Sequence, residues 1–388
     1  MIGEWGLGGR RGSGRLRGAS IVGGKGMNLL KACGTSLAGA AVALSAVLWT
    51  QGAEAQAKPF DGITLRVATF GGPWRDDLAK YVAPKLEALG GKVEFVIGSP
   101  QDNLAKIIAA RGREVPFDVV EILDAQFDQV VEGGLLVPID YSAVPNASQI
   151  EPWQRNPNAV GNWTTQEVIC YDKGKFAELG IPVPTTYKDL ANDKLAGRVM
   201  FADITGGGGL ANFAGITYAS GGDTTTVKPG LDTIRTFKGV KFWKAGGDVV
   251  AAFKTGDIYV AVAHSGWCLR SIKYAGANVA SVHPKINDKQ KGVMKVGWLG
   301  VVKGTRNAAA AMFFVNAYLD EEFQIAFAKN SGVWPVNKKA MQRLRTEDPV
   351  FVALNNIEQA DIDRMLRVDY KGVNVNNWYD QWNRAVSK

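Results

Sequence analysis

The chain has 388 residues with 45 Lys and Arg against 37 Asp and Glu, a formal charge of +8, and it contains only 3 Cys and 2 His. Its length is typical of two domains, and 46% hydrophobic with 21% charged residues indicate a globular protein. So few Cys and His residues exclude a disulfide-rich scaffold and a four-Cys zinc site. No His, Cys, Asp and Glu residues have metal-ligand spacing, so we predict neither a metal nor another cofactor.

The first 57 residues have the composition of an export signal. Residues 32–49 are uncharged and rich in small and apolar residues, and residues 53–55 (Ala-Glu-Ala) satisfy the small-x-small rule of a secretory cleavage site. We predict cleavage after Ala55 or Ala57 and export to the periplasm, with Met27 as an alternative start. An uncleaved membrane anchor is the other interpretation, because 18 residues are near the shortest length that spans a bilayer.

Cleavage at that point removes most of the basic character. It leaves 39 cationic and 35 anionic side chains, a charge of +4, on 331 residues. No run of Lys and Arg with interleaved aromatic residues remains, so we expect no nucleic-acid partner.

The mature chain alternates strand-like and helical patterns, which is typical of an α/β protein. In chain order, its first part predicts a strand over 63–70, a helix over 75–89, a strand over 93–97, a helix after Ser99 and a strand over 117–123. The helix after Ser99 has the clearest start, because Pro100 stands at N1 and Asp102 at N3. Asp124 directly follows the third strand.

Residues 144–165 are rich in Pro, Asn and Trp, and we interpret them as a crossover between domains rather than a core element. A second α/β series follows. It predicts strands over 168–171, 199–202, 258–263 and 296–302, helices over 186–193 and 210–219, and one long amphipathic helix over 307–328.

One glycine run lies where a strand passes into a helix. Thr205 precedes Gly206, Gly207, Gly208 and Gly209, and their N–H groups can receive an anion. A P-loop is excluded, because Leu-Ala rather than Lys-Ser/Thr follows the last glycine. The alternative is a flexible turn. Asp203, just before this loop, either selects a ligand amine or caps the turn.

Two further strand ends carry candidate contacts. Residues 71–72 (Gly-Gly) would let a ligand approach the main chain, with Trp74 as a flat wall, or they form a Gly-Pro turn with a packed Trp. His264 and Ser265 follow another strand, but adjacent residues have the wrong geometry for a base and its nucleophile. We interpret that pair as pocket lining or as packing.

Cys170 and Cys268 are the thiols of the mature chain. Export to an oxidising compartment permits a disulfide between them, and two buried free thiols are the alternative.

Several segments of the mature chain, taken in order, resemble the periplasmic solute-binding proteins of ABC transporters, in the spermidine/putrescine-binding-like group. These segments are FGG at 70–72, FDVV at 117–120, GGLLVPID at 133–140, PTTYKDL at 184–190, LAGRV at 195–199, KGTRN at 303–307 and SGVWPVNKKA at 331–340. The resemblance covers the whole mature chain. It implies an α/β protein with the two-lobe periplasmic-binding-protein fold (type II), a ligand in the cleft between lobes joined by crossing strands, and delivery to a membrane permease.

The chain departs from the polyamine binders at their ligand-binding acids. Asp203 matches the first of three carboxylates, the second falls in the glycine run, and the third falls at about Gly297, while His264 replaces an aromatic residue. A buried dication without counter-charges carries a large desolvation cost. We therefore expect an amino-acid-like or other zwitterionic or anionic solute, with Arg75 or Arg270 as further candidate contacts, and a polyamine-like solute is the alternative. Related iron binders use adjacent tyrosines, which this chain lacks, so ferric ion is not expected.

The prediction is a monomeric, non-enzymatic substrate-binding component of an ABC importer, whose partners are a small organic solute and the permease subunits. The predicted lobes are 58–165 with 297–340, and 166–296 with 341–388. The predicted cleft contacts are Trp74, Asp102, Asp124, Asp203, Thr205, Gly206, Gly207, Gly208, Gly209, His264, Ser265, Trp298 and Trp334. The alternatives are an exported enzyme that uses Ser265 or Asp203, and an N-terminally anchored sensor or scaffold.

Overall fold

The computed structural model describes residues 57–110 and 113–386. The predicted export signal up to residue 56, with the first cleavage point, lies outside these residues. Within the described ranges, no helix combines the length and the apolar character needed to cross a membrane.

A mixed sheet runs through the described part of the chain in the order β2-β1-β3-β9-β4-β7-β5-β6, with β10 beside β9 and β8 beside β4. The strands are β1 (Thr64–Thr69), β2 (Lys92–Ile97), β3 (Val119–Leu123), β4 (Ala159–Asp172), β5 (Val199–Ala202), β6 (Lys241–Trp243), β7 (Val260–His264), β8 (Val279–Val282), β9 (Val293–Val301) and β10 (Leu366–Arg367). The pairs β1·β2, β1·β3, β5·β6 and β5·β7 are parallel. These four pairs form two parallel groups of the kind expected from βαβ units.

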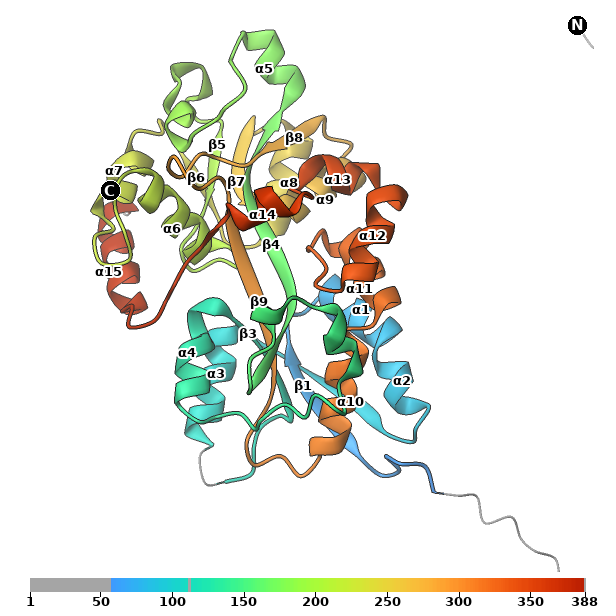
Figure 1. Ribbon diagram of the computed structural model, residues 1–388. Helices are drawn as coiled ribbons and strands as arrows, with labels where there is room; N and C mark the ends of the chain where they lie inside the picture. Colours follow the sequence, from blue (N-terminus) through green and yellow to red (C-terminus); the bar gives the residue numbers. More distant parts are fainter. Residues whose placement is uncertain (1–56, 111–112, 387–388) are drawn as a thin grey trace, which may run out of the picture. The chain divides into compact units, whose positions relative to one another are not determined.

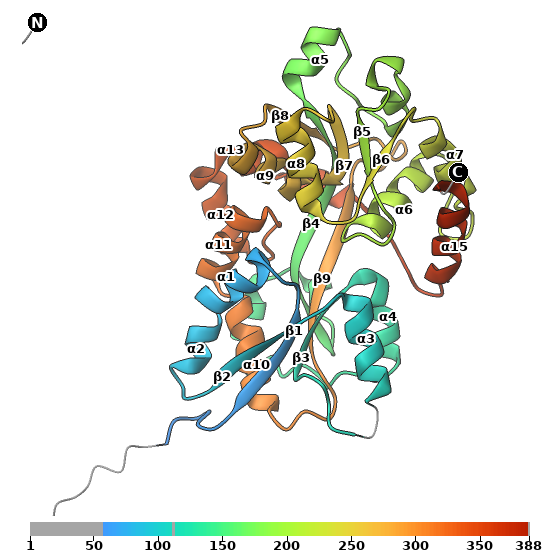
Figure 2. The same cartoon turned by 180° about the vertical axis from the view of Figure 1, so that it is seen from behind.

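Strands β4 and β9 join the two parallel groups. The C-terminal half of β9 pairs antiparallel with β3, and most of its length pairs with β4. The C-terminal part of β4 pairs antiparallel with β7. Both strands therefore pass from one group to the other, as Figures 1 and 2 show from opposite sides.

Helices cover the sheet around both groups (Figure 1). Those packed around the first group are α1 (Pro73–Tyr81), α2 (Ala83–Glu87), α3 (Pro100–Ala109), α4 (Asp124–Glu132), α10 (Ala308–Tyr318) and α11 (Glu321–Ser331). The others are α5 (Lys173–Leu179), α6 (Gly209–Ala219), α7 (Lys228–Arg235), α8 (Gly246–Thr255), α9 (Ser265–Ala275), α12 (Lys338–Glu347), α13 (Pro349–Leu354), α14 (Gln359–Asp363) and α15 (Val375–Val386).

The largest apolar cluster includes the C-terminal helix. Trp378 and Trp382 of α15 are 2% and 1% exposed, and both rings make edge contacts with Phe213 of α6. Burying a large aromatic side chain contributes about 1.5–3 kcal/mol. The chain end is therefore fixed against α6, the helix that follows the glycine run.

Residues 159–165 correct the interpretation of 144–165 as a crossover outside the core. Short 3-10 turns at Pro145–Gln149 and Pro152–Gln154 precede β4, but 159–165 form the buried first half of that strand. Because several of these side chains are polar, the sequence pattern did not predict a core strand here. Trp163 Nε1 and Asn162 Nδ2 donate to Glu121 Oε1 at 2.5 and 2.9 Å. These tertiary hydrogen bonds offset the cost of burying the two polar groups.

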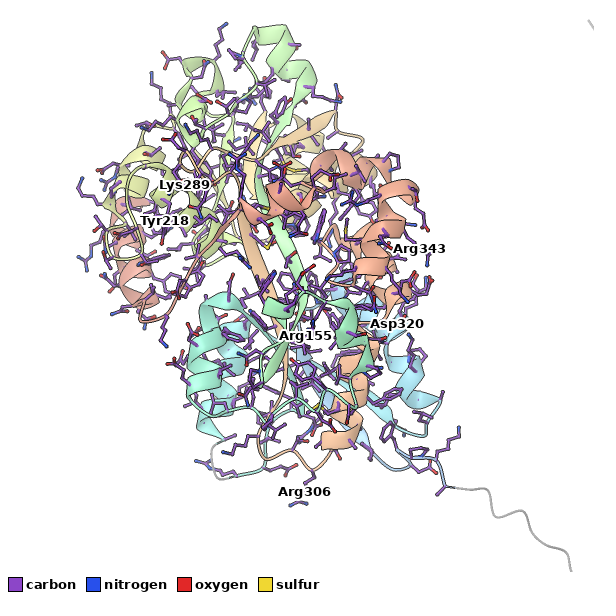
Figure 3. The ribbon with its side chains drawn as sticks, in the orientation of Figure 1. Arg155, Tyr218, Lys289, Arg306, Asp320 and Arg343 are labelled. Atoms are coloured by element: carbon purple, nitrogen blue, oxygen red, sulfur yellow. A yellow bond between two sulfur atoms is a disulfide. The ribbon has the colours of Figure 1, made fainter. Side chains whose placement is uncertain are left out.

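Two predicted helices are each divided. The pattern over 75–89 forms α1 and α2, because Pro84 lacks the N–H that would continue the first helix. The pattern over 307–328 forms α10 and α11, since Asp320 caps α11 by accepting from the N–H groups of Glu322 and Phe323. Figure 3 labels Asp320, and Arg343 of α12 lies near it. The predicted helix over 186–193 is a 3-10 turn at Tyr187–Ala191.

Cys170 of β4 and Cys268 of α9 form a disulfide, with their Cα atoms 5.8 Å apart. Both residues are fully buried. The bond fastens α9 to one of the two strands that join the parallel groups.

Candidate functional site

A cavity of about 490 Å³ lies at the carboxyl ends of β1, β3 and β5. It is lined by Phe70, Gly71, residues 97–101, residues 123–126, residues 204–211, Lys295, Tyr370 and Tyr379. Ligands of open α/β sheets bind at this end of the strands. The cavity brings together three of the predicted contact segments: Asp124, Thr205 and the glycine run.

Asp124 begins α4 directly after β3 and is partly buried in the cavity wall. Its Oδ1 accepts from its neighbour's N–H, that of Ala125, at 2.9 Å, and its Oδ2 accepts from Val296 N–H at 3.2 Å. Loss of hydration raises the pKa of this carboxyl to about 7, while these N–H groups and the nearby Lys295 lower it. Asp124 can therefore gain or lose its proton near neutral pH.

Lys295 of β9 is a cavity residue that the sequence analysis missed. Its side chain is 7% exposed, and its Nζ donates to Gly207 O at 2.6 Å. The same ammonium lies 3.7 Å from Glu167 Oε1 and 5.7 Å from the ring centre of Trp163. A single lysine inside an apolar strand pattern was the signal in the sequence, because buried lysines require partners.

The glycine loop rests on buried polar side chains. Asn212 Nδ2 donates to Gly208 O at 2.8 Å and to Glu167 Oε2 at 2.6 Å. A Cβ at Gly209 would lie 2.1 Å from Asp203 O, so only glycine allows this tight turn. The loop leads into α6, whose first-turn N–H groups have no intrahelical acceptor. Lys295 and this helix start thus place N–H donors along one part of the cavity.

Packing explains one departure from the polyamine-binding pattern. A Cβ at Gly297 would lie 2.2 Å from the indole of Trp163. That indole donates to Glu121, whose carboxylate also accepts from Thr69, Trp74, Asn162 and Tyr318. Any side chain at position 297 would displace Trp163, so no ligand-binding acid fits there.

Two predicted contacts are close in sequence to cavity residues but do not line the cavity. Asp203 Oδ1 accepts from Thr205 N–H at 2.9 Å and from its hydroxyl at 2.5 Å. This geometry is that of a turn cap. Trp74 packs edge-on against Trp163 and Phe327, with ring centres 5.1 and 4.4 Å apart, and its Nε1 donates to Glu121.

His264 and Ser265 are buried away from the cavity. His264 Nδ1 accepts from Gly266 N–H at 3.1 Å, and Ser265 Oγ donates to Asn355 Oδ1 at 2.6 Å. Burial lowers the pKa of His264 well below its usual value. The serine and the histidine therefore have separate structural partners and do not form a nucleophile–base pair.

The three remaining predicted contacts lie elsewhere. Asp102 accepts from Ser99 Oγ at the start of α3 and is exposed. Trp298 packs against Phe127, with ring centres 4.3 Å apart. Trp334 stacks on Phe351 in the core and lines a separate cavity of about 340 Å³ beside α12 and α14.

Within residues 57–110 and 113–386, no group of three or more His, Cys, Asp and Glu residues could hold a metal ion. The cavity instead offers one ammonium, one carboxylate, main-chain N–H groups and two phenol rings. These groups can donate to and accept from a small polar organic molecule.

Comparisons with known proteins find relatives and similar solved structures. The iron uptake protein A1 of Synechocystis sp. is 25% identical over 261 residues, which cover 64% of this chain and 69% of the relative. The gamma-aminobutyric acid-binding protein of Pseudomonas aeruginosa is 23% identical over 335 residues, which cover 82% of this chain and 90% of the relative. A crystal structure of an ABC transporter from Clostridium perfringens matches with a TM-score of 0.65 and 23% identity, covering 83% of this chain and 99% of that chain.

The sequence profile of the bacterial extracellular solute-binding proteins matches residues 80–353, more than half of the chain. The likeness to these solved structures covers 83% of the chain. The chain therefore belongs to the bacterial extracellular solute-binding protein family and has its two-lobe α/β fold.

Proposed function

We propose that this protein is the substrate-binding component of an ABC importer and captures a small organic solute that carries an acidic group. The observation that carries this proposal is Lys295, a buried lysine in the cavity wall whose ammonium has two protein partners, Gly207 O and Glu167. An ammonium has three N–H donors, and Gly207 O accepts from only one of them. Glu167, at 3.7 Å, is an ion-pair partner beyond hydrogen-bond distance, so donors are left for a solute carboxylate. The start of α6 supplies further donors.

This chemistry disfavours a polyamine. A dication beside Lys295 would meet a like charge in a partly dehydrated site, and position 297 has no room for the acid that polyamine binders use there. The ammonium of Lys295 would also repel ferric ion. The gamma-aminobutyric acid-binding relative takes a solute with a carboxylate, which fits the donors of this cavity.

The transport role rests on membership of the solute-binding protein family, and the two parallel groups with their joining strands are compatible with it. We propose that the groups form lobes over 58–165 with 297–340 and over 166–296 with 341–388. They would close on the solute by bending at β4 and β9 and then present it to a permease. The exported, signal-cleaved protein would act as a monomer in the periplasm. Ser265 and His264 have separate partners, Asn355 and Gly266, which favours binding over catalysis at this pair.

The test is mass spectrometry of the solute that remains bound when the exported protein is purified under native conditions. We expect a compound with a carboxylate or another acidic group, recovered unchanged. Lys295→Met should lose it, whereas Lys285→Met should retain it, because Lys285 pairs with Asp288 in an exposed loop. A retained polyamine, a metal ion, or a solute converted to product would contradict the proposal.

A further inference from the structure

The charges of the cavity are not balanced within the protein. Lys295 has Glu167 as its counter-charge, at 3.7 Å. The oxygens of Asp124 accept only main-chain N–H groups, from Ala125 and Val296. When Asp124 is ionised, the lining therefore presents a carboxylate that has no cation of its own in direct contact. A partly dehydrated carboxylate in that position favours a bound cation or a proton.

Uncharged acceptors lie beside this carboxylate. Gln126, in the same turn of α4, is 6% exposed and lines the cavity. Its Nε2 donates to Gln101 Oε1 at 3.4 Å, and its Oε1 has no hydrogen-bond partner. Tyr370 and Tyr379 complete the lining with aromatic rings, which are compatible with a cation or with an apolar chain.

We propose that Asp124 receives an ammonium group of the solute while Lys295 receives its acidic group, so that the cavity selects zwitterions such as amino acids. This assignment rests on the proposed function and adds to the acidic group of the solute a second recognised charge, its ammonium group. An amine brings the missing counter-charge to Asp124. A carboxylic acid without an amine leaves that carboxylate uncompensated, and an amine without an acid leaves the remaining N–H donors of Lys295 unused.

Solute binding should then release a proton. Burial raises the pKa of Asp124 to about 7 in the free protein, so at pH 7 about half of the molecules hold this proton. The charged groups that face Asp124 from other elements are Lys295 on β9, which lowers its pKa, and Glu167 on β4, which raises it. Tyr370, on the segment after β10, is buried, and its pKa lies well above the ordinary value, so it stays neutral. An arriving ammonium stabilises the ionised form and expels the proton.

The test is titration calorimetry of the exported protein, freed of solute, with four compounds of equal chain length: 4-aminobutanoate, 2-aminobutanoate, butanoate and butylamine. We expect at least one amino acid to bind ten or more times tighter than both butanoate and butylamine. Binding should release about half a proton per solute at pH 7. The binding heats measured in phosphate and in Tris should therefore differ by about half of the difference between the protonation enthalpies of the two buffers.

Asp124→Asn should remove both the preference for the amino acid over butanoate and the buffer dependence. Asp102→Asn is the matched control, because Asp102 also lies in the first turn of a helix but outside the cavity. Thermal unfolding of both variants verifies that they fold. Butanoate binding within threefold of both amino acids, or a preference that survives Asp124→Asn, would overturn the assignment and leave the acidic-solute proposal intact. Binding of butylamine alone, or of none of the four, would overturn both.

Discussion

The ammonium nitrogen of Lys295 lies 3.7 Å from Oε1 of Glu167, and the two side chains are 7% and 0% exposed. They come from β9 and β4, the strands that join the two lobes. Glu167 also accepts from Thr165 and Asn212, and Asn212 in turn holds the carbonyl of Gly208. The ion pair therefore connects the joining strands to the glycine loop of the cavity.

Removing one partner of this ion pair should destabilise the protein strongly. Lys295→Met leaves Glu167 as a buried charge without its cation, and we expect a loss of about 3–5 kcal/mol in the free energy of unfolding. Adding Glu167→Gln to that variant should restore part of the loss. Guanidinium unfolding measures each value, with Lys285→Met, an exposed change, expected within about 0.5 kcal/mol of wild type. Equal stability of Lys295→Met and wild type would refute this role.

Two neighbouring glycines should respond differently to alanine. A Cβ at Gly209 would lie 2.1 Å from Asp203 O and 2.5 Å from Ile204 C, whereas a Cβ at Gly207 has no atom within 4 Å. Gly209→Ala should therefore distort the loop, cost about 1–3 kcal/mol and weaken solute binding. Gly207→Ala should change the free energy of unfolding by less than about 0.5 kcal/mol. Chemical unfolding of both variants measures this contrast, and equal losses would show that the tight turn is not the constraint.

The disulfide should contribute substantially to stability. Cys170 and Cys268 are 98 residues apart in sequence, so their bond restricts a long loop of the unfolded chain. Replacing both with alanine should cost about 2–4 kcal/mol. Urea unfolding measures the loss, and wild type unfolded and refolded with a reductant should approach the variant. A midpoint that neither the reductant nor the double substitution lowers would be inconsistent with a stabilising bond.

His283 should make the folded state sensitive to acid. It is 7% exposed, its Nε2 lies 2.6 Å from Gln166 Oε1, and burial lowers its pKa from 6.5 to about 4. Between these values the unfolded chain binds a proton that the folded protein does not, so stability falls as the pH drops from about 6.5 to about 4. The total loss from this residue is about 3 kcal/mol.

The variant His283→Gln isolates that contribution. The difference in unfolding free energy between wild type and variant should shrink as the pH falls through this window. The contribution of Asp124 to the pH dependence of stability has the opposite sign. Its pKa is raised to about 7 in the folded state, so above pH 3.8 the folded protein holds a proton that the unfolded chain has lost. Its contribution is common to both proteins and cancels in the difference. A difference that is constant from pH 7 to pH 4 would rule out the predicted titration.

The sequence alone determined the α/β alternation, the resemblance to solute-binding proteins, and the placement of Asp124 and the glycine run after strands. These features are local, because period, turn residues and short motifs are properties of neighbouring residues. Because β1 and β3 are parallel neighbours, the residues that follow them lie at one edge of the sheet. Strand β5 belongs to the other parallel group and runs in the opposite direction, so the glycine run meets those residues only through the joining strands β4 and β9.

Only the tertiary structure decided which candidates meet there. Lys295 becomes a cavity residue through Gly207 and Glu167, which are 88 and 128 positions away in the chain. Partners in the core bind the side chains of His264, Ser265 and Trp74. Residues 159–165 form a buried strand because Glu121 accepts hydrogen bonds from Asn162 and Trp163. Hydrogen bonds and ion pairs between distant residues set these positions, and no local pattern encodes them.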